Sequence, residues 1–366
     1  MTRLDAVVLA GGEGTRLRPL TYDIPKQLLP VAGLTMLERV LESLAAGGVV
    51  DAVVSLGYLP TAFKEAFPEA RAAGVSLTYV VEDEPLGTGG AVAFAAREAG
   101  LWGRRLVVRN GDVVTDMDLG LLVEAHERMG GAATIALVEV EDASRYGVVQ
   151  TDPDGRVRSF VEKPVGLPGR SACINAGTYV MEPEAISFIP QGRAVSIERE
   201  VFPELASRGL LYAWTVRGYW VDAGTPSSYL AANLDLLRGS LSLALPAGAK
   251  PAGPGVWVLP ECRIDAAILE QVLVGRGSQL QDRARVEGAV IGSNCWLGSG
   301  VTVRRSVLMD GVVVEDGAVV EDSIVGPAVV VGRRARLAEG SVVGGNVHVE
   351  AGSDFRGVCI GRQGLQ

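Results

Sequence analysis

Residues 11–21 read GGEGTRLRPLT, a glycine-rich run that follows the apolar segment 6–10 and precedes Lys26. Glycine lets the backbone turn sharply and direct its N–H groups at anionic oxygens, and Arg16 and Lys26 add positive charge beside that turn. The spacing fits neither a P-loop, which needs GxxxxGK, nor a dinucleotide fingerprint, whose third glycine would fall on Leu17. An ordinary strand-to-loop turn is the simpler alternative, and the cations that follow make it the weaker one. The run therefore predicts a loop that binds the phosphates of a nucleoside triphosphate.

Residues 4–140 alternate short β-branched runs with segments of helical pattern. This alternation indicates a mostly parallel sheet with helices on both faces. Ligands of such sheets bind at the carboxyl ends of the strands, which is where residues 11–21 and 110–112 fall. Residues 145–230 are less regular and are expected to complete the pocket, while 240–255 are rich in Pro, Gly and Ala and indicate a linker.

Beyond residue 255 the helical pattern ends, and aliphatic residues recur every 17 positions in three columns, one of which runs through Val286, Val303 and Val320. The columns are offset by five or six residues, so each repeat would contain three short strands. Steps such as Ile291-Gly292 are typical of hexapeptide repeats. Chance recurrence in a valine-rich segment is the alternative, but three columns in register over several repeats favour a β-helix.

Size, charge and composition restrict the class of protein. The 366 residues suggest two domains, and the formal charge of −9 argues against nucleic acid as a partner. Four scattered cysteines without a CxxC pair indicate neither a zinc site nor a disulfide framework. Two histidines are little material for a histidine metal cluster or a Ser-His-Asp triad. No apolar run approaches the roughly 20 residues of a transmembrane helix, so we expect a soluble cytoplasmic protein without a membrane partner.

Seven motifs, taken in order, resemble those of the sugar-phosphate nucleotidyltransferases, which join a sugar 1-phosphate to a nucleoside triphosphate. The motifs are GGEGTRLRPLT (11–21), PKQLLPVAG (25–33), EPLGTGG (84–90), NGD (110–112), FVEKP (160–164), INAG (174–177) and YWVDAGTP (219–226). The resemblance implies an α/β fold. A Rossmann-like nucleotidyltransferase domain with a mostly parallel sheet would span residues 1–239, a linker 240–255 and a left-handed β-helix 256–366.

In such enzymes an oxygen of the sugar phosphate attacks the α-phosphate of the nucleotide, so the barrier is largely electrostatic. The resemblance makes Asp112 and Asp222 the ligands of Mg²⁺, an ion that takes one or two carboxylates together with phosphate oxygens. It makes Arg16 the contact of the β- and γ-phosphates, Lys26 the cation at the α-phosphate and leaving group, and Lys163 the clamp of the sugar phosphate. The structural alternatives are a turn residue for Asp112, a helix N-cap for Asp222 and a solvated lysine for Lys163.

The remaining site residues are also assigned through the resemblance. The nucleotide-binding set is Gly11, Gly12, Gly14, Thr15, Arg16, Glu82, Gly87 and Thr88, and the sugar-binding set is Gly147, Glu162, Lys163 and Asn175. Glu82 lies where family members place a side chain at the edge of the base. A carboxylate accepts two hydrogen bonds, which suits the N1–H and amino group of guanine, whereas thymine offers one imide donor. A solvated loop residue is the alternative for Glu82.

Several stretches favour mannose-1-phosphate guanylyltransferases, with GTP and mannose 1-phosphate as substrates. They are EPLGTGG, IPQG at 189–192, VSIEREVFP at 195–203 and the appended β-helix. KQLLP at 26–30 instead resembles thymidylyltransferases, which leaves glucose-1-phosphate thymidylyltransferase or another sugar nucleotidyltransferase as the alternative. We expect the β-helix to serve assembly or regulation, giving a homo-oligomer.

Two functions from other classes are less well supported. An acyltransferase on the β-helix would need a catalytic histidine, for which only His348 is available, and a lone histidine on a coil is usually structural. An inactive regulatory homologue would be expected to have lost charged site residues, yet the chain keeps all five that matter. These are Arg16, Lys26, Asp112, Lys163 and Asp222.

Overall fold

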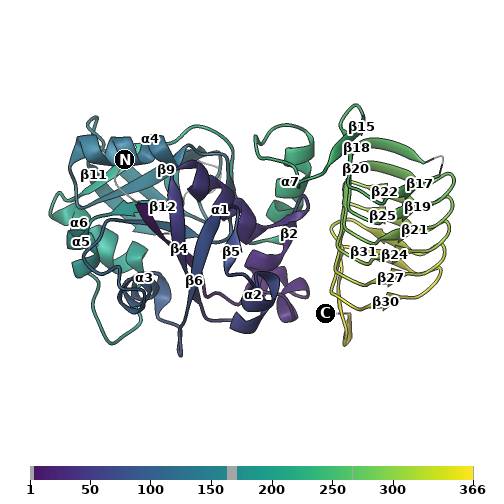
Figure 1. The fold of residues 1–366 in the computed structure, drawn as a ribbon, viewed down its shortest axis with the longest axis horizontal. Coiled ribbons are helices and arrows are strands. Elements are labelled where there is room, and N and C mark those ends of the chain that lie inside the picture. The colour runs from purple at the N-terminus through teal and green to yellow at the C-terminus, as the bar shows by residue number, and fades with distance from the viewer. Residues whose placement is uncertain (1–3, 163–170, 266, 366) are drawn as a thin grey trace. The chain divides into compact units, whose positions relative to one another are not determined.

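The chain folds into two compact units in the computed structural model (Figure 1). The residues that the structure describes are 4–162, 171–265 and 267–365. The sheet unit contains residues 1–12 and 37–220, and the β-helix unit contains residues 13–36 and 221–366. The chain therefore passes from one unit to the other three times. The domain boundaries expected from the sequence, at residues 239 and 256, remain a prediction.

The sheet unit is built around a sheet whose central strands are parallel. The strands of this unit are β1 (Leu4–Ala10), β4 (Val49–Leu56), β5 (Arg71–Ala72), β6 (Val75–Val81), β7 (Leu106–Asn110), β8 (Val113–Thr115), β9 (Ala133–Val140), β10 (Gly147–Thr151), β11 (Val157–Glu162), β12 (Ala172–Met181) and β13 (Leu211–Thr215). β1 pairs in parallel with β4 and with β7, so Val8 lies between Val54 and Arg109. β12 runs antiparallel to β7. β1 and β7 are buried almost throughout, which explains their apolar runs 6–10 and 106–108, and the parallel pairing of β7, β1, β4 and β6 confirms the predicted sheet.

Helices cover both faces of this sheet, with α1 and α4 on one face and α3, α5 and α6 on the other (Figure 1). The helical segments are α1 (Met36–Ala46), α2 (Pro60–Ala66), α3 (Gly87–Glu98), α4 (Leu119–Met129), α5 (Pro183–Ser187), the π-helix η4 (Ile197–Val201) and α6 (Phe202–Ser207). α4 begins at Asp118, whose carboxylate accepts from Gly120 N at 2.8 Å, and ends at Gly130 with φ of 67°. The short helices between residues 183 and 207 were not predicted, because five or six residues cannot display a helical period.

The β-helix unit opens with the segment 13–36 and continues from residue 221 into stacked coils (Figure 1). Its first elements are η1 (Thr15–Leu17), η2 (Leu20–Tyr22), η3 (Lys26–Leu28), β2 (Pro30–Val31), β3 (Leu34–Thr35) and α7 (Pro226–Leu237), and β14 (Trp220–Asp222) lies at its border with the sheet unit. The coil strands are β15 (Lys250–Gly253), β16 (Val256–Val258), β17 (Arg263–Ile264), β18 (Ile268–Val274), β19 (Gln279–Leu280), β20 (Arg285–Ile291), β21 (Trp296–Leu297), β22 (Thr302–Arg304), β23 (Val307–Leu308), β24 (Val313–Val314), β25 (Val319–Glu321), β26 (Ile324–Val325), β27 (Val330–Val331), β28 (Arg336–Ala338), β29 (Val342–Val343), β30 (His348–Val349), β31 (Asp354–Arg356), β32 (Cys359–Gly361) and β33 (Gly364–Leu365). The predicted linker 240–255 thus contains the strand β15.

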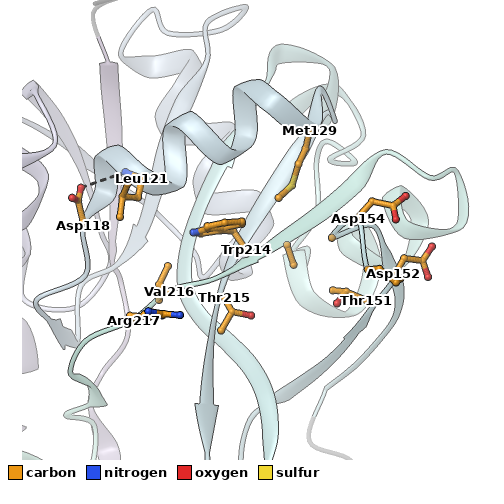
Figure 2. Close-up of a pocket in the computed structure, with 13 residues that line it drawn as sticks. Asp118, Leu121, Met129, Thr151, Asp152, Asp154, Trp214, Thr215, Val216 and Arg217 are labelled. Atoms are coloured by element: carbon orange, nitrogen blue, oxygen red, sulfur yellow. Dashed lines mark hydrogen bonds between the residues drawn. The ribbon is translucent and has the colours of Figure 1, made fainter.

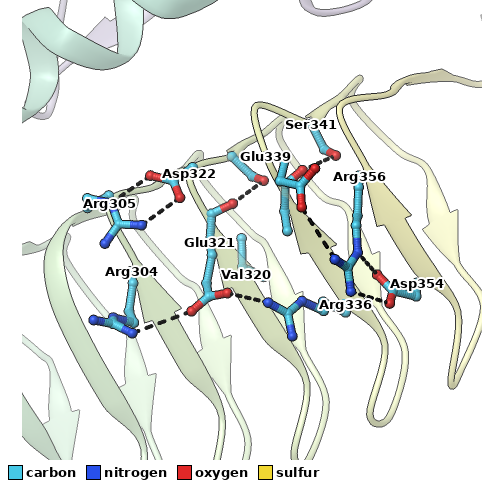
Figure 3. Close-up of polar contacts among 12 residues, drawn as sticks. Arg304, Arg305, Val320, Glu321, Asp322, Arg336, Glu339, Ser341, Asp354 and Arg356 are labelled. Carbon is cyan, nitrogen blue, oxygen red and sulfur yellow. Dashed lines mark hydrogen bonds and ion pairs between the residues drawn. The ribbon is translucent and has the colours of Figure 1, made fainter.

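In the earlier coils, residues 17 positions apart lie directly beside one another, whereas β26 pairs with β29 at a spacing of 18, since Ile324 pairs with Val342. Val286 lies opposite Val303, and Val303 lies opposite Val320, as the periodic columns predicted. These valines belong to the buried core of the coils. On the outer surface the same register brings opposite charges together, and Arg305 forms two hydrogen bonds of 2.6 Å with Asp322 (Figure 3). Among the described residues, no helix is both long and apolar enough to cross a membrane.

Candidate active site

The glycine-rich run continues into the β-helix unit as residues 13–28, which we call the phosphate loop. Gly14 has a φ of +65°, a conformation that side chains other than glycine rarely adopt. A Cβ atom on Gly14 would lie 3.1 Å from the Lys26 Cβ and 3.1 Å from the Thr21 Cγ2. The Thr21 hydroxyl donates a hydrogen bond to the Gly14 carbonyl at 2.8 Å. The glycine is therefore needed for both backbone angle and close approach, which lets the predicted Lys26 lie against the turn.

Arg16 and Asp222, predicted for different roles, lie together in the β-helix unit. The Arg16 Nη2 is 3.7 Å from the Asp222 Oδ2, and the arginine side chain is 58% exposed. The Asp222 Oδ1 accepts a hydrogen bond from Gly224 N at 2.8 Å. A Cβ on Gly224 would lie 2.7 Å from the Arg16 Nη2, so this glycine leaves the room that the guanidinium occupies. Sequence reasoning missed Gly224 as a site residue, although it lies inside the YWVDAGTP motif.

In the sheet unit, Gly11 and Glu82 meet at the carboxyl ends of β1, β4 and β6. The Glu82 Oε1 accepts from the Ser55 hydroxyl at 2.8 Å, and its Oε2 accepts from Leu86 N at 3.0 Å. A Cβ on Gly11 would lie 3.3 Å from the Glu82 Oε1, and one on Gly57 would lie 2.8 Å from the Gly11 carbonyl oxygen. Each carboxylate oxygen can accept a further hydrogen bond. Glu82 is thus a fixed acceptor beside the predicted Gly11, and its reading of a base remains a prediction.

Gly87 and Thr88 connect the start of α3 to the segment 195–200. Gly87 has a φ of +70°, and a Cβ there would lie 2.6 Å from the Val195 carbonyl oxygen. The Thr88 hydroxyl donates to the Glu198 Oε2 at 2.6 Å and accepts from Ile197 N at 2.9 Å. Two motifs separated by about a hundred residues are thereby locked together. Glu198 was not predicted as a site residue, and no signal near it in the sequence points to Thr88.

The predicted sugar-binding residues lie on the antiparallel part of the sheet. Gly147 of β10 is opposite Glu162 of β11, and a Cβ on Gly147 would lie 2.7 Å from the Glu162 Oε2. The Asn175 amide donates from Nδ2 to the Tyr179 hydroxyl at 2.9 Å and accepts from Gly177 N at 2.9 Å. Gly147 and Glu162 are adjacent, therefore, and the orientation of Asn175 is fixed. Lys163 falls outside the described residues.

Three carboxylates create a negative potential around Tyr179 in the sheet unit. The pKa of Tyr179 is raised well above its ordinary value, and burial is the largest cause. The charges of Glu198, Glu162 and Asp112 raise this pKa further. Within the described parts of the chain, no group of three Asp, Glu, His or Cys side chains forms a metal cage. A Mg²⁺ site need not be such a cage, because the ion binds through one or two carboxylates and substrate phosphates. The assignment of Asp112 and Asp222 as its ligands remains a prediction.

A separate cavity of about 660 Å³ lies on the sheet unit (Figure 2). It is formed by α4, β13 and the turn 151–155, with Leu121, Met129 and Trp214 among its lining. None of its lining residues belongs to the predicted site. The chemistry of the glycine loops and carboxylates, rather than cavity size, therefore identifies the candidate active site.

Known proteins share both parts of the chain. Residues 5–239 match the family described as Nucleotidyl transferase, and residues 260–355 match the family described as EIF2B subunit epsilon LbH domain. The chain is 39% identical over 308 residues to the mannose-1-phosphate guanylyltransferase of Mycobacterium tuberculosis, which covers 83% of this chain and 84% of that protein. It is 34% identical over 350 residues to mannose-1-phosphate guanylyltransferase 1 of Arabidopsis thaliana, with 94% and 92% covered.

A solved structure agrees with the first of these matches. HddC from Yersinia pseudotuberculosis complexed with GMP-PN has a TM-score of 0.55 and 32% sequence identity, covering 64% of this chain and 99% of that one. The match over residues 260–355 confirms the expected left-handed β-helix. The match over residues 5–239 contains every motif on which the resemblance was based. The chain belongs to the nucleotidyl transferase family and carries a C-terminal left-handed β-helix.

Proposed function

We propose that the protein transfers GMP from GTP to mannose 1-phosphate and releases pyrophosphate. The observation that carries this proposal is the phosphate loop, in which Lys26 packs closely against Gly14 and Arg16 lies beside Asp222. Relatives named mannose-1-phosphate guanylyltransferase, matched over most of the chain, support the choice of substrates. The GMP-PN complex of HddC supports a guanine nucleotide.

The proposal assigns each charged residue one task. Arg16 binds the β- and γ-phosphates, Lys26 neutralises the α-phosphate and the pyrophosphate that leaves, and Lys163 binds the phosphate of the sugar. Asp112 and Asp222 would hold Mg²⁺, which would reduce the repulsion between the two anionic substrates. Because the sugar phosphate is already an oxyanion, the reaction needs positioning and charge neutralisation rather than a general base.

The nucleoside and the sugar are recognised by polar groups of the sheet unit. Glu82, fixed by Ser55 and Leu86, is assigned to the N1–H and amino group of guanine. Gly11, Gly87 and the other loop residues supply backbone contacts. Glu162 and Asn175 are assigned to sugar hydroxyls, with the Gly147 backbone against the ring. The runner-up remains glucose-1-phosphate thymidylyltransferase, which the KQLLP stretch at residues 26–30 favours.

The first test is pyrophosphate release with Mg²⁺ for GTP, dTTP, UTP, CTP and ATP, each with mannose 1-phosphate and glucose 1-phosphate. We expect the GTP and mannose 1-phosphate pair to dominate. A dominant dTTP and glucose 1-phosphate pair would select the runner-up, and no turnover with any pair would support an inactive regulatory homologue.

The metal assignment is tested with Asp222→Asn. Loss of a metal ligand should lower kcat by about 100-fold or more and raise the Mg²⁺ concentration for half-maximal rate. Asp235→Asn is the matched control, because Asp235 is an aspartate of α7 that forms an ion pair with Arg238 and has no assigned role in metal binding. A slow Asp222→Asn variant with unchanged Mg²⁺ dependence would contradict the metal role and point to structural contacts such as those with Arg16 and Gly224.

We also infer a cytoplasmic homo-oligomer that assembles through the β-helix, on the grounds of the sequence and of the flat faces of the coils. Light scattering of the purified protein measures the oligomeric state. A monomer over the micromolar range would contradict this inference.

A further inference from the structure

One outer face of the β-helix is apolar and buried. Leu273, Val290, Val307, Ile324 and Val342 are paired in succession along β18, β20, β23, β26 and β29. They alternate with the residues that fill the coil core, so they point away from it. Each is nevertheless at most 3% exposed. Other segments must cover this face, and α7 of the same unit contacts β18 and β20.

The segment that follows the phosphate loop, residues 30–33, is fixed on α7. The Asn233 Oδ1 accepts a hydrogen bond from Ala32 N at 2.8 Å, and Asn233 is fully buried. The Tyr229 hydroxyl donates to the Pro30 carbonyl. A Cβ on Gly33 would lie 3.5 Å from the Leu273 Cδ2, at the first end of the apolar face. Residues 30–33 are thus anchored by buried contacts.

The upstream part of the loop meets the last two coils instead. The Arg362 Nη2 lies 3.1 Å from the Asp23 Oδ2, and both side chains are 55% exposed. A Cβ on Gly344 would lie 3.1 Å from the Pro19 Cβ and 3.3 Å from its carbonyl oxygen. Beside these contacts is a cavity of about 360 Å³, lined by Tyr22 and Gly345 among others. These two contacts join this part of the loop to the coils, next to a space that protein atoms do not fill.

A displacement at these contacts would also move the residues that are assigned to binding the phosphates. Thr21 lies between Pro19 and Asp23 in the chain, and its hydroxyl holds the Gly14 carbonyl at 2.8 Å. Gly14 in turn lies against Lys26, because a Cβ on Gly14 would be 3.1 Å from the Lys26 Cβ. A shift of Pro19 or Asp23 therefore moves Thr21, and with it the turn that places Lys26.

We propose that the last two coils of the β-helix position the phosphate loop for the nucleoside triphosphate, with Gly344 and Arg362 as positioning residues. The β-helix then contributes to catalysis within its own chain, beyond any part in assembly. This inference rests on the proposed function, since it requires that the loop bind nucleotide phosphates.

The test compares Arg362→Ala and Gly344→Ala with Arg276→Ala in the full-length protein. Arg276 forms an ion pair of 2.8 Å with Glu261 at a similar exposure of 51%, but in the first coils and without a contact to the loop. We expect Arg362→Ala to raise KM for the nucleotide about 2- to 5-fold, which is the range of an exposed ion pair, and to leave KM for the sugar 1-phosphate unchanged. The charge exchange Asp23→Arg with Arg362→Asp should restore the nucleotide KM.

A second readout does not depend on turnover. Hydrogen exchange of residues 13–28 in the ligand-free protein should accelerate in Arg362→Ala and Gly344→Ala and remain as in the wild type in Arg276→Ala. Unchanged exchange and an unchanged nucleotide KM in both loop variants would overturn the positioning role. If the wild type turns over no substrate pair but exchange still accelerates, the proposed function fails while the mechanical coupling stands.

Discussion

Arg109 carries a guanidinium group into the interior of the sheet unit, one residue before the turn that leads to Asp112. Its side chain is fully buried, and its Nη1 donates to the Ser43 hydroxyl at 2.8 Å. Among residues 4–162, 171–265 and 267–365, neither its Nε nor its Nη2 has a hydrogen-bond partner. Burial lowers the pKa of Arg109 to about 10. The group is still charged at neutral pH, so the fold bears the cost of its desolvation.

We predict that Arg109→Met raises the free energy of unfolding at pH 7 by about 1–3 kcal/mol, because an apolar chain of similar length replaces a buried charge. The lowered pKa means that the unfolded chain binds the proton more tightly than the native protein. This penalty is therefore complete below about pH 10 and declines as the pH rises above that value. Urea denaturation measures the difference, and Ser43→Ala should act in the opposite direction. A methionine variant of lower stability would contradict the prediction.

His126 is the second residue whose burial has a measurable consequence. It is 2% exposed, with Nδ1 2.8 Å from the Thr134 hydroxyl and Nε2 3.1 Å from the Glu182 Oε1. Burial lowers the pKa of His126 and outweighs the hydrogen bond to Glu182, which acts in the opposite direction. The native imidazole is thus neutral at pH 7.

We predict that the protein loses stability as the pH falls below about 6.5, because the unfolded histidine takes up a proton that the native one resists. The contribution is complete above the unfolded pKa and is lost as the pH falls through it toward the lower native pKa. His126→Gln should show a shallower decline of the free energy of unfolding from pH 7.5 to 5.5. His348→Gln is the control, since His348 is exposed. Parallel curves for the wild type and His126→Gln would contradict this assignment.

At the scale of the element, the start of α3 depends on one glycine. Gly87 and Gly130 have nearly the same φ, +70° and +67°. Gly130 ends α4 with no atom within 4 Å of a Cβ, whereas a Cβ on Gly87 would lie 2.6 Å from the Val195 carbonyl oxygen. The two positions therefore share backbone strain and differ in steric contact.

We predict that Gly130→Ala costs about 1 kcal/mol of stability, from the strained φ alone, and that Gly87→Ala costs about 1–3 kcal/mol more. The additional loss comes from displacement of the segment 195–200, which Gly89 N and Leu86 also hold through hydrogen bonds to Val195. Thermal or urea unfolding of the two variants gives the comparison. Equal losses of stability would contradict the prediction, because they would show that the Val195 carbonyl can move aside at no cost in free energy.

At the scale of the whole molecule, the chain order and the compact units do not coincide. The phosphate loop follows β1 directly in sequence, yet it belongs to the same unit as the C-terminal coils. Cooperative opening follows spatial contacts rather than chain order, so the loop should share the stability of the coils.

We predict that Leu308→Ala in the coil core accelerates amide exchange at Leu28 and Leu29, whose N–H groups donate to the Pro25 and Lys26 carbonyls. Leu308 is fully buried, and its truncation should cost about 2–5 kcal/mol. Leu106→Ala is the matched variant, since Leu106 is also fully buried but lies in the core of the sheet unit. Exchange measured by mass spectrometry should respond to the first variant and not to the second. The reverse pattern would assign the loop to the sheet unit.

The sequence alone established the two architectures and the order of the motifs. Parallel buried strands produce continuous apolar runs, and stacked coils produce a 17-residue period, because both patterns arise from local backbone geometry. Gly14 of the phosphate loop was predictable for the same reason, since its left-handed φ is a local requirement. Tertiary structure decided which distant groups meet, such as Thr88 with Glu198, Arg16 with Asp222 and Gly344 with Pro19. These contacts depend on how separate segments pack, and no periodicity within one segment encodes its partner.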